Sequence, residues 1–339
     1  MTDGLKYTHW IYQDSRCHML EIDLNVRQLR PVMDKQEFPF NSGHPQTVAV
    51  ETGAVVCGPG GYNITLYHEL GIQDQPQHVL VVDGEIWTTG LGGGGYGVLV
   101  GDTVKVQKNR VQVHLWARGN VVEIEHVNRG HEGEVVLFTP RGGTNEYPKY
   151  RGKFFYTLRD GAVQKIAQTP LHMWPGTVVV ESTYDLGLEV GEAATLKQNL
   201  GADDVDHIMS GWPQIVRAGE NIVDEYQLDP TESHGPDAWF TMRNPRTAIG
   251  CSEDGKTAYM FCVEGRLPNE YKPDAPKSRG LRLKGLAETL VRHGVHDAVN
   301  MDGGGSAFQW SLEAEIFGCY NTSETIQGQR RAHFSASVY

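Results

Sequence analysis

A glycine-rich stretch near the C-terminal end combines residue types that a binding site needs. It reads DAVNMDGGGSAFQW, residues 297–310, and places a short apolar run before Asp302, three glycines and Ser306. Three consecutive glycines are costly in chain entropy, and they usually mark a positive φ or a backbone that lies against a ligand. An acid before the glycines and a hydroxyl after them favour a ligand. A tight hairpin with a polar tip is the alternative.

The polar groups of this stretch are of the types that bind an anion and transfer a proton. Asp302 could serve as general acid, general base, nucleophile or cation ligand, or only as a turn-forming aspartate. The hydroxyl of Ser306 and the N–H groups of residues 303–305 could donate to phosphate oxygens, because successive backbone N–H groups form an anion-binding concavity. Asn300 lies two residues before Asp302, so both side chains would point to one side of a strand.

A helix and a buried strand are predicted to position Asp302. Four apolar residues recur with the i, i+3, i+4, i+7 spacing of one helix face, namely Leu283, Leu286, Ala287 and Leu290. Gly294 follows where a helix C-terminus favours a left-handed residue. Asp302 would then lie at the carboxyl end of the strand, the edge where sheets covered by helices tend to bind ligands.

A second polar group, Arg246, lies in the segment NPRTAIG just before another apolar run. Its planar guanidinium matches phosphate oxygens and stays charged, although a surface ion pair is the alternative. Asn244 and Thr247 flank it and add hydrogen-bonding capacity.

The composition is that of a soluble globular protein. Hydrophobic residues make up 39% and charged residues 21% of the 339 residues, and no apolar stretch approaches the length of a membrane span. A net charge of −12 argues against nucleic acid as the main partner. The N-terminus lacks the apolar region of a secretory signal, so the sequence predicts a soluble, cytoplasmic protein. Five widely spaced cysteines predict neither a disulfide framework nor a zinc site, and most are expected to be buried small hydrophobes.

We expect an α+β fold, with strand-rich mixed sheets and few helices, in a single domain over residues 1–339. Its N-terminal part, 1–205, is strand-rich, and the part 206–339 bears the motifs. The Asp-Gly pairs at 83–84 and 160–161 predict hairpins. The segment GLGGGGYG, residues 90–97, is interpreted as a slack surface loop in preference to a functional lid.

The motifs together resemble the phosphodiester glycosidase family. The resemblance rests on VNMDGGGSAFQW, on NPRTAIGCSEDGKTAYMFCVEGR at 244–266 and on SRGLRLKGLAETLVRHG at 278–294, in the family's order. It implies the family's fold, a phosphate-linked carbohydrate as substrate, and relatives that are often secreted. It also implies a second glycine site at Gly60 and Gly61 and a loop threonine at Thr144. Pro59 stands where the family has an asparagine.

Residues and resemblance together nominate Asp302 and Arg246 as catalytic. The substrate-binding candidates are Asn244, Thr247, Asn300, Gly303, Gly304, Gly305, Ser306, Gly60, Gly61 and Thr144. Glycoside cleavage usually uses two carboxyl groups, and the second has only weak candidates, namely Glu51, Glu181 and Asp185. No motif requires a cofactor, and the use of a divalent cation stays open.

Two functions follow from these features. The first is a hydrolase that cleaves between a sugar anomeric carbon and phosphate in a sugar-1-phosphodiester. The alternative is a non-catalytic glycan- or phosphoglycan-binding module, which the loss of the asparagine at Pro59 motivates. Hydrolysis of a plain polysaccharide bond lacks a second confident carboxylate.

Overall fold

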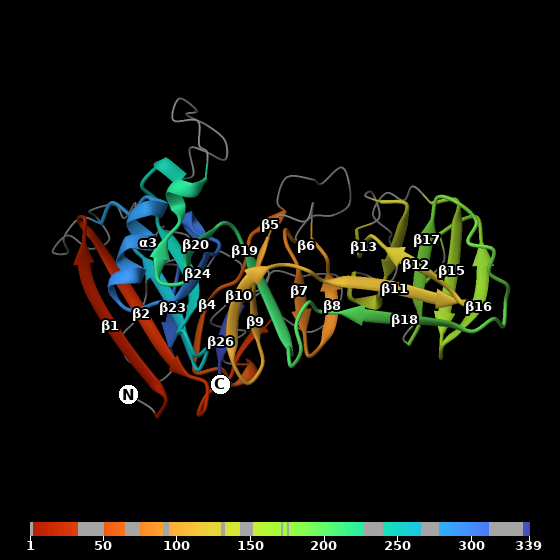
Figure 1. The fold of residues 1–339 in the computed structure, drawn as a ribbon, viewed down its shortest axis with the longest axis horizontal. Coiled ribbons are helices and arrows are strands. Elements are labelled where there is room, and N and C mark those ends of the chain that lie inside the picture. Colours follow the sequence, from red (N-terminus) through yellow and green to blue (C-terminus); the bar gives the residue numbers. More distant parts are fainter. Residues whose placement is uncertain are drawn as a thin grey trace.

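The computed structural model confirms a strand-rich α+β fold (Figure 1). It describes residues 3–32, 51–64, 75–90, 95–129, 133–142, 152–170, 172–174, 176–226, 240–265, 278–311 and 335–339. The helix α3 (Leu283–Arg292) is the one α-helix described from end to end, and three short 3-10 turns accompany it, η2 (Pro140–Gly142), η3 (Val223–Glu225) and η4 (Gly304–Ser306). Within these residues no helix has the length and apolar character needed to cross a membrane.

The largest sheet carries the motif-bearing strands. Its seven strands lie in the order β1 (Leu5–Tyr12), β2 (Ser15–Asp23), β23 (Thr257–Val263), β22 (Arg246–Cys251), β24 (Asp297–Asn300), β20 (Gln214–Arg217) and β21 (Glu220–Asn221). All neighbours in it are antiparallel. Because β2 pairs with β23, the two ends of the sequence build one sheet.

Two further sheets cover one face of this large sheet. One contains β10 (Val104–Lys108), β9 (Tyr96–Val100), β19 (His207–Gly211), β7 (Leu80–Val82) and β8 (Glu85–Thr88). The other contains β25 (Trp310–Ser311), β4 (Val56–Pro59), β26 (Ser335–Val338) and β3 (Leu29–Val32), and β5 (Asn63–Ile64) pairs separately with β6 (Gln75–Pro76). Their buried side chains share a core with Ile249, Val299 and Met301.

Residues 111–199 form a distal lobe, drawn in yellow and green on the right of Figure 1. One of its sheets contains β12 (Asn120–Ile124), β11 (Gln112–Ala117) and β18 (Ala194–Asn199). The other contains β13 (His126–Val127), β14 (Val135–Phe138), β17 (Val178–Ser182), β15 (Phe154–Arg159) and β16 (Ala162–Ala167), with β13 and β14 parallel. The lobe leaves the body after β10 and returns before β19, so the chain enters and leaves it through one sheet of the body.

Local sequence signals explain several of these elements. Asp83 and Gly84 both have positive φ, +49° and +72°, as a two-residue type I′ hairpin requires. Asp160 and Gly161 repeat the pattern with φ of +51° and +73°. Helix α3 buries the predicted apolar face against the large sheet, and Gly294 ends it with a φ of +79°. Both hairpin predictions and the helix prediction are therefore confirmed.

Of the four cysteines that the structure describes, three behave as predicted. Cys17, Cys57 and Cys251 are free and buried, and burial raises the pKa of the Cys17 and Cys251 thiols to about 12. Cys262 is disulfide-bonded, which an odd number of widely spaced cysteines did not indicate. Sequence spacing does not reveal such a bond, because the fold decides which cysteines come within bonding distance.

Candidate functional site

Antiparallel pairing brings the two predicted catalytic residues together. In the register of β22 and β24, Ala248 lies opposite Asn300 and Ile249 opposite Val299. Beyond the paired residues, the Met301 N–H donates to the Thr247 carbonyl, and a Cβ at Gly303 would lie 3.5 Å from the Arg246 Cα, so Arg246 lies beside the turn that bears Asp302. The site therefore includes the carboxyl end of β24, as predicted. It also includes the amino end of β22, because neighbouring strands in this sheet are antiparallel.

The turn that bears Asp302 is held by three hydrogen bonds. The Met301 N–H donates to the Thr247 carbonyl over 3.0 Å, and the Thr247 hydroxyl donates to the Asp302 carbonyl over 2.5 Å. The Asp302 N–H donates to the carbonyl of Gly60 over 3.2 Å. This last bond connects the two predicted glycine sites. Gly60 and Gly61 are both buried. Asp302 itself is partly exposed.

The glycine run is required by close packing and by backbone conformation. A Cβ at Gly303 would lie 2.8 Å from the Pro245 carbonyl oxygen, and Gly304 has a φ of +59°. The Gly304 N–H donates to the Pro245 carbonyl over 2.9 Å, and the Ser306 N–H donates to the Gly303 carbonyl over 3.0 Å. These two N–H groups are therefore engaged within the chain. Gly305 and the Ser306 side chain are buried in the η4 turn.

The Arg246 side chain is buried and hydrogen-bonded to backbone carbonyls. Its residue is 6% exposed, and its Nε donates to the Leu281 carbonyl over 3.1 Å. One Nη donates to the Met242 carbonyl over 2.9 Å. A guanidinium has five N–H donors in a plane, so these two bonds fix the orientation of the rest. Asn244 is also buried, and its backbone pairs with Leu281 through bonds of 3.1 and 2.9 Å.

Asn300 joins this site to a tyrosine that the sequence reasoning did not nominate. The Asn300 side-chain amide donates to the Trp212 carbonyl over 3.0 Å and to the Tyr62 hydroxyl. Burial raises the pKa of Tyr62 above its ordinary value, while Arg246 lowers it and Asp302 raises it. Tyr62 is therefore within electrostatic reach of both charges. The GGY sequence after Pro59 was the signal that could have identified it.

His78, which the sequence analysis also did not nominate, lies next to Tyr62. Its ring meets the Tyr62 ring edge to face, with centroids 6.3 Å apart and planes at 87°. Burial, together with the smaller effect of the positive charge of Arg129, lowers the pKa of His78 to about 4. A Cβ at Gly95 would lie 2.9 Å from the His78 ring, and one at Gly90 would lie 2.6 Å from its Cα. The described ends of the 90–97 segment are thus packed against His78 and are not slack.

The structure does not bring a second carboxylate candidate to Asp302. Glu181 lies in β17 and Asp185 follows it, both in the distal lobe, far from β24 (Figure 1). Glu51 is exposed and precedes β4, at the opposite end of that strand from Gly60. Thr144 lies outside the described residues. The sequence places each of these carboxylates near a strand, but it does not show which strands belong to the sheet that carries Asp302.

Another carboxylate, Glu264, follows β23 at the same end of the large sheet as Arg246. It is buried, accepts a hydrogen bond from Arg16 over 2.5 Å and lies 3.1 Å from the His18 ring nitrogen. These contacts engage both of its oxygens. In the part of the chain that is described, no group of three or more His, Cys, Asp or Glu side chains is arranged to hold a metal ion.

Comparisons with known proteins agree with the motifs. The family model for phosphodiester glycosidases matches residues 118–333, more than half of the chain. Curated relatives from Homo sapiens and Mus musculus, both named N-acetylglucosamine-1-phosphodiester alpha-N-acetylglucosaminidase, are 32% identical over 104 residues. That alignment covers 30% of this chain and only 18% of each relative.

Solved structures show the same fold. A protein from Synechocystis aligns with a TM-score of 0.75 and 15% identity, over 98% of this chain and 61% of that one. A protein from Burkholderia pseudomallei aligns with a TM-score of 0.73 and 18% identity, over 96% and 74% of the two chains. The zebrafish N-acetylglucosamine-1-phosphodiester alpha-N-acetylglucosaminidase catalytic domain, auto-inhibited by its pro-peptide, gives 0.50 and 16%, over 100% and 84%.

The matched region contains the strand that begins at Arg246 and the turn that bears Asp302, the same elements that the register places side by side. The motif resemblance is therefore confirmed, and the chain belongs to the phosphodiester glycosidase family.

Proposed function

We propose that this protein hydrolyses a sugar-1-phosphodiester between the anomeric carbon and the phosphate. The observation that carries the proposal is the register that sets Arg246, buried and oriented, beside the turn of Asp302. The names of the human and mouse relatives describe this class of bond, with N-acetylglucosamine as the sugar. Membership of the family extends that class to this chain, while the sugar is left to experiment.

In this proposal Arg246 binds the phosphate oxygens through its guanidinium. Asp302 accepts a proton from water, whose oxygen forms the new bond to the anomeric carbon. The bond from that carbon to the phosphate oxygen breaks, and its electron pair leaves with the phosphate monoester. Because a phosphate monoester departs readily, it needs electrostatic support more than a proton. One carboxylate then suffices, which agrees with the absence of a second one among the described residues beside Asp302.

The remaining candidates divide into two kinds of support. Asn300, Asn244, the Ser306 side chain and the backbone of Gly303 and Gly305 form the proposed wall for sugar and phosphate, whereas the Gly304 N–H is already bonded to the Pro245 carbonyl. Thr247 and Gly60 hold the backbone of the turn that bears Asp302, as the bonds to the Asp302 carbonyl and N–H indicate, and Gly61 follows Gly60 in the same buried segment. Tyr62 joins the first group through its bond with Asn300.

The replacement Asp302→Asn tests this assignment. Turnover of N-acetylglucosamine-1-phosphodiester and glucose-1-phosphodiester compounds should fall by about a hundredfold or more, the usual range for loss of a general base. The assay is run with and without chelator, and loss with chelator would add a metal ion to the site. Asp160→Asn is the matched control, because asparagine also accepts the positive φ of that distal hairpin turn. If Asp302→Asn retains wild-type turnover, the role of Asp302 is wrong.

The alternative, a non-catalytic phosphoglycan-binding module, rests on Pro59. This residue is buried in β4, pairs with Ser335 and cannot supply the donor and acceptor groups of an asparagine side chain. A binding module would retain affinity for the same compounds in wild type and Asp302→Asn, would lose it in Arg246→Ala, and would release no free sugar from any of them.

A further inference from the structure

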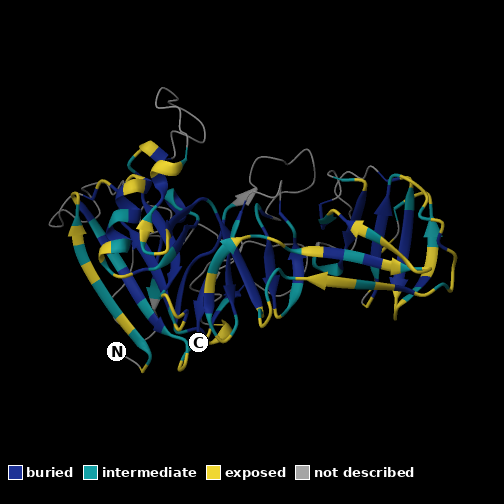
Figure 2. Ribbon diagram, in the orientation of Figure 1, coloured by how far each residue is buried: buried dark blue, intermediate teal, exposed yellow. Residues whose placement is uncertain are grey.

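The outer face of one distal sheet exposes a tryptophan among polar side chains. Residues of β11 alternate between buried Val113 and Leu115 and outward Gln112, His114 and Trp116. Trp116 is 42% exposed, an unusual position for so large an apolar ring. Figure 2 shows exposed residues along β11 and β18, on the outside of the lobe.

The strand registers place the exposed Val121 and Thr195 directly opposite Trp116, and polar groups at the next positions on the same face. Glu123 lies opposite His114 on β12, and Lys197 lies opposite His114 on β18. The Lys197 ammonium sits 4.4 Å from the Trp116 ring centroid. Gln112 and Asn199 are direct cross-strand partners at the end of the sheet nearest the body. We call this surface the Trp116 face.

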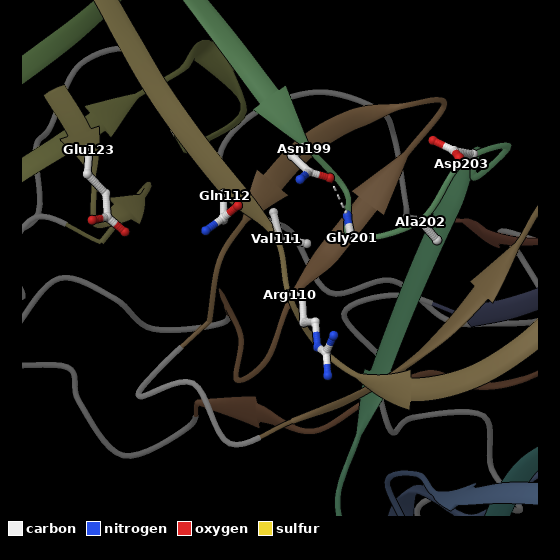
Figure 3. A pocket seen from close by; sticks show the side chains of 8 residues that line it. All are labelled: Arg110, Val111, Gln112, Glu123, Asn199, Gly201, Ala202 and Asp203. Atoms are coloured by element: carbon white, nitrogen blue, oxygen red, sulfur yellow. Dashed lines mark hydrogen bonds between the residues drawn. The ribbon is translucent and has the colours of Figure 1, made fainter. Parts of the chain in front are cut away.

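A hollow of about 710 Å³ continues the Trp116 face toward the body of the molecule. Gln112, Glu123 and Asn199 belong to both, and Arg110 and Asp203 complete the polar lining, as Figure 3 shows. The hollow lies where the chain enters the distal lobe after β10 and where it returns before β19. It is distant from the turn of Asp302 and has no part in the proposed hydrolysis.

The chemistry of this surface suits hydroxyl groups attached to rings. Amide side chains such as Gln112 both donate and accept, Arg110 donates through a planar fork, and Glu123 and Asp203 accept. A sugar presents alternating hydroxyl donors and acceptors on its edge and apolar C–H groups on its face, which an exposed indole ring can cover. Acid and base charges are balanced here, so a neutral ligand fits better than a polyanion.

A protein partner fits this surface less well. The cores of protein interfaces are depleted in Lys, Glu and Asp. Here Lys197 lies over the Trp116 ring, Glu123 lies opposite the neighbouring His114, and Asp203 lines the adjoining hollow. The lining of the hollow is also dominated by polar side chains, whereas pockets for drug-like ligands are mostly apolar.

We propose that the Trp116 face and its hollow bind a neutral oligosaccharide, with one sugar stacked on Trp116 and others hydrogen-bonded beside Gln112. The two residues are four positions apart on β11, about 13 Å at roughly 3.3 Å per residue. An oligosaccharide, rather than a single sugar, reaches from one to the other. The exposed Lys197 ammonium moves aside when the sugar binds. The inference does not depend on Asp302, because binding requires no turnover.

Isothermal titration of the full chain with cellohexaose, maltohexaose and chitohexaose tests the proposal. At least one of these probes should bind, and Trp116→Ala should weaken that binding by about tenfold or more. Gln112→Ala should weaken it by a smaller factor. Turnover of a small sugar-1-phosphodiester should be the same in wild type and Trp116→Ala, so failure of the hydrolase proposal remains a separate result.

Trp174→Ala is the matched control, because Trp174 is 63% exposed and belongs to the same lobe but not to the Trp116 face. It should bind the probe as wild type does. The proposal is overturned if no probe binds, if Trp116→Ala binds unchanged, or if Trp174→Ala loses as much affinity. Light scattering adds one outcome: a dimer that Trp116→Ala converts to monomer would assign the face to a second copy of the chain instead.

Discussion

Arg246 shows how a single charged residue is prepared for a ligand before the ligand arrives. The carbonyls of Leu281 and Met242 accept two of its N–H groups, so the guanidinium plane is set during folding. A free arginine side chain loses about 2 kcal/mol of rotamer entropy when it is ordered. In this protein most of that rotamer entropy is lost on folding, so the binding of a phosphate would lose less of it. Lysine, with a point charge and a flexible stem, could not be positioned by the same two carbonyls.

His78 makes stability depend on pH at the scale of one residue. The unfolded chain protonates this histidine near pH 6.5, whereas in the folded protein its pKa is about 4. Between these values the unfolded state binds more protons, so stability rises with pH through this window and is fully present above it. Lowering the pH from 7 to 5 should cost on the order of 2 kcal/mol from His78 alone.

Urea unfolding of wild type and His78→Phe at both pH values measures this contribution. Burial also lowers the pKa of His207, so wild type includes a second contribution of the same sign. The Phe variant keeps a ring against Tyr62 and should lose only the part that His78 supplies. An equal pH dependence in both proteins would show that His78 already titrates normally in the folded state.

At the scale of elements, the sequence predicts helices and turns from local signals, but it does not predict which distant strands pair. The apolar spacing of α3 and the Asp-Gly turns are encoded within a few neighbouring residues, and the structure confirms both. The approach of Arg246 to Asp302 depends on which strands pair, and 55 residues of sequence separate Thr247 from the Asp302 carbonyl that it binds. Tyr62 and His78 reach the site from a still more distant part of the chain, so motif spacing did not reveal them.

The glycine turn offers a sharp prediction at this scale. In Gly303→Ala the new Cβ would lie 2.8 Å from the backbone oxygen of Pro245, and backbone cannot rotate away as a side chain can. The turn must shift, and a displacement near 1 Å can reduce turnover by about a hundredfold. Gly161→Ala is the control, since its φ is +73° and no atom lies within 4 Å of the added Cβ. It should cost about 1 kcal/mol of stability and no turnover. Equal kinetics in the two variants would contradict the role of Gly303.

At the scale of the whole molecule, the distal lobe and the body share one hydrophobic core. Leu115 and Ile124 of the lobe belong to the same buried cluster as Val81, Leu99 and Ile208 of the body. Domains that unfold independently are joined by small, polar interfaces. A shared apolar core should instead couple the lobe to the distant strand β24, although the Trp116 face and the turn of Asp302 lie on different parts of the molecule.

Leu115→Ala tests this coupling because the side chain is fully buried in β11. The cavity should lower the free energy of unfolding by about 2–5 kcal/mol. Hydrogen exchange of peptides from β11 and from β24 should report the same loss, since cooperative opening exposes both. Val121→Ala, on the neighbouring strand and 47% exposed, should change neither by more than about 0.5 kcal/mol. If Leu115→Ala accelerates exchange in β11 alone, the lobe unfolds by itself, and a sugar bound at the Trp116 face could not stabilise the site around Asp302.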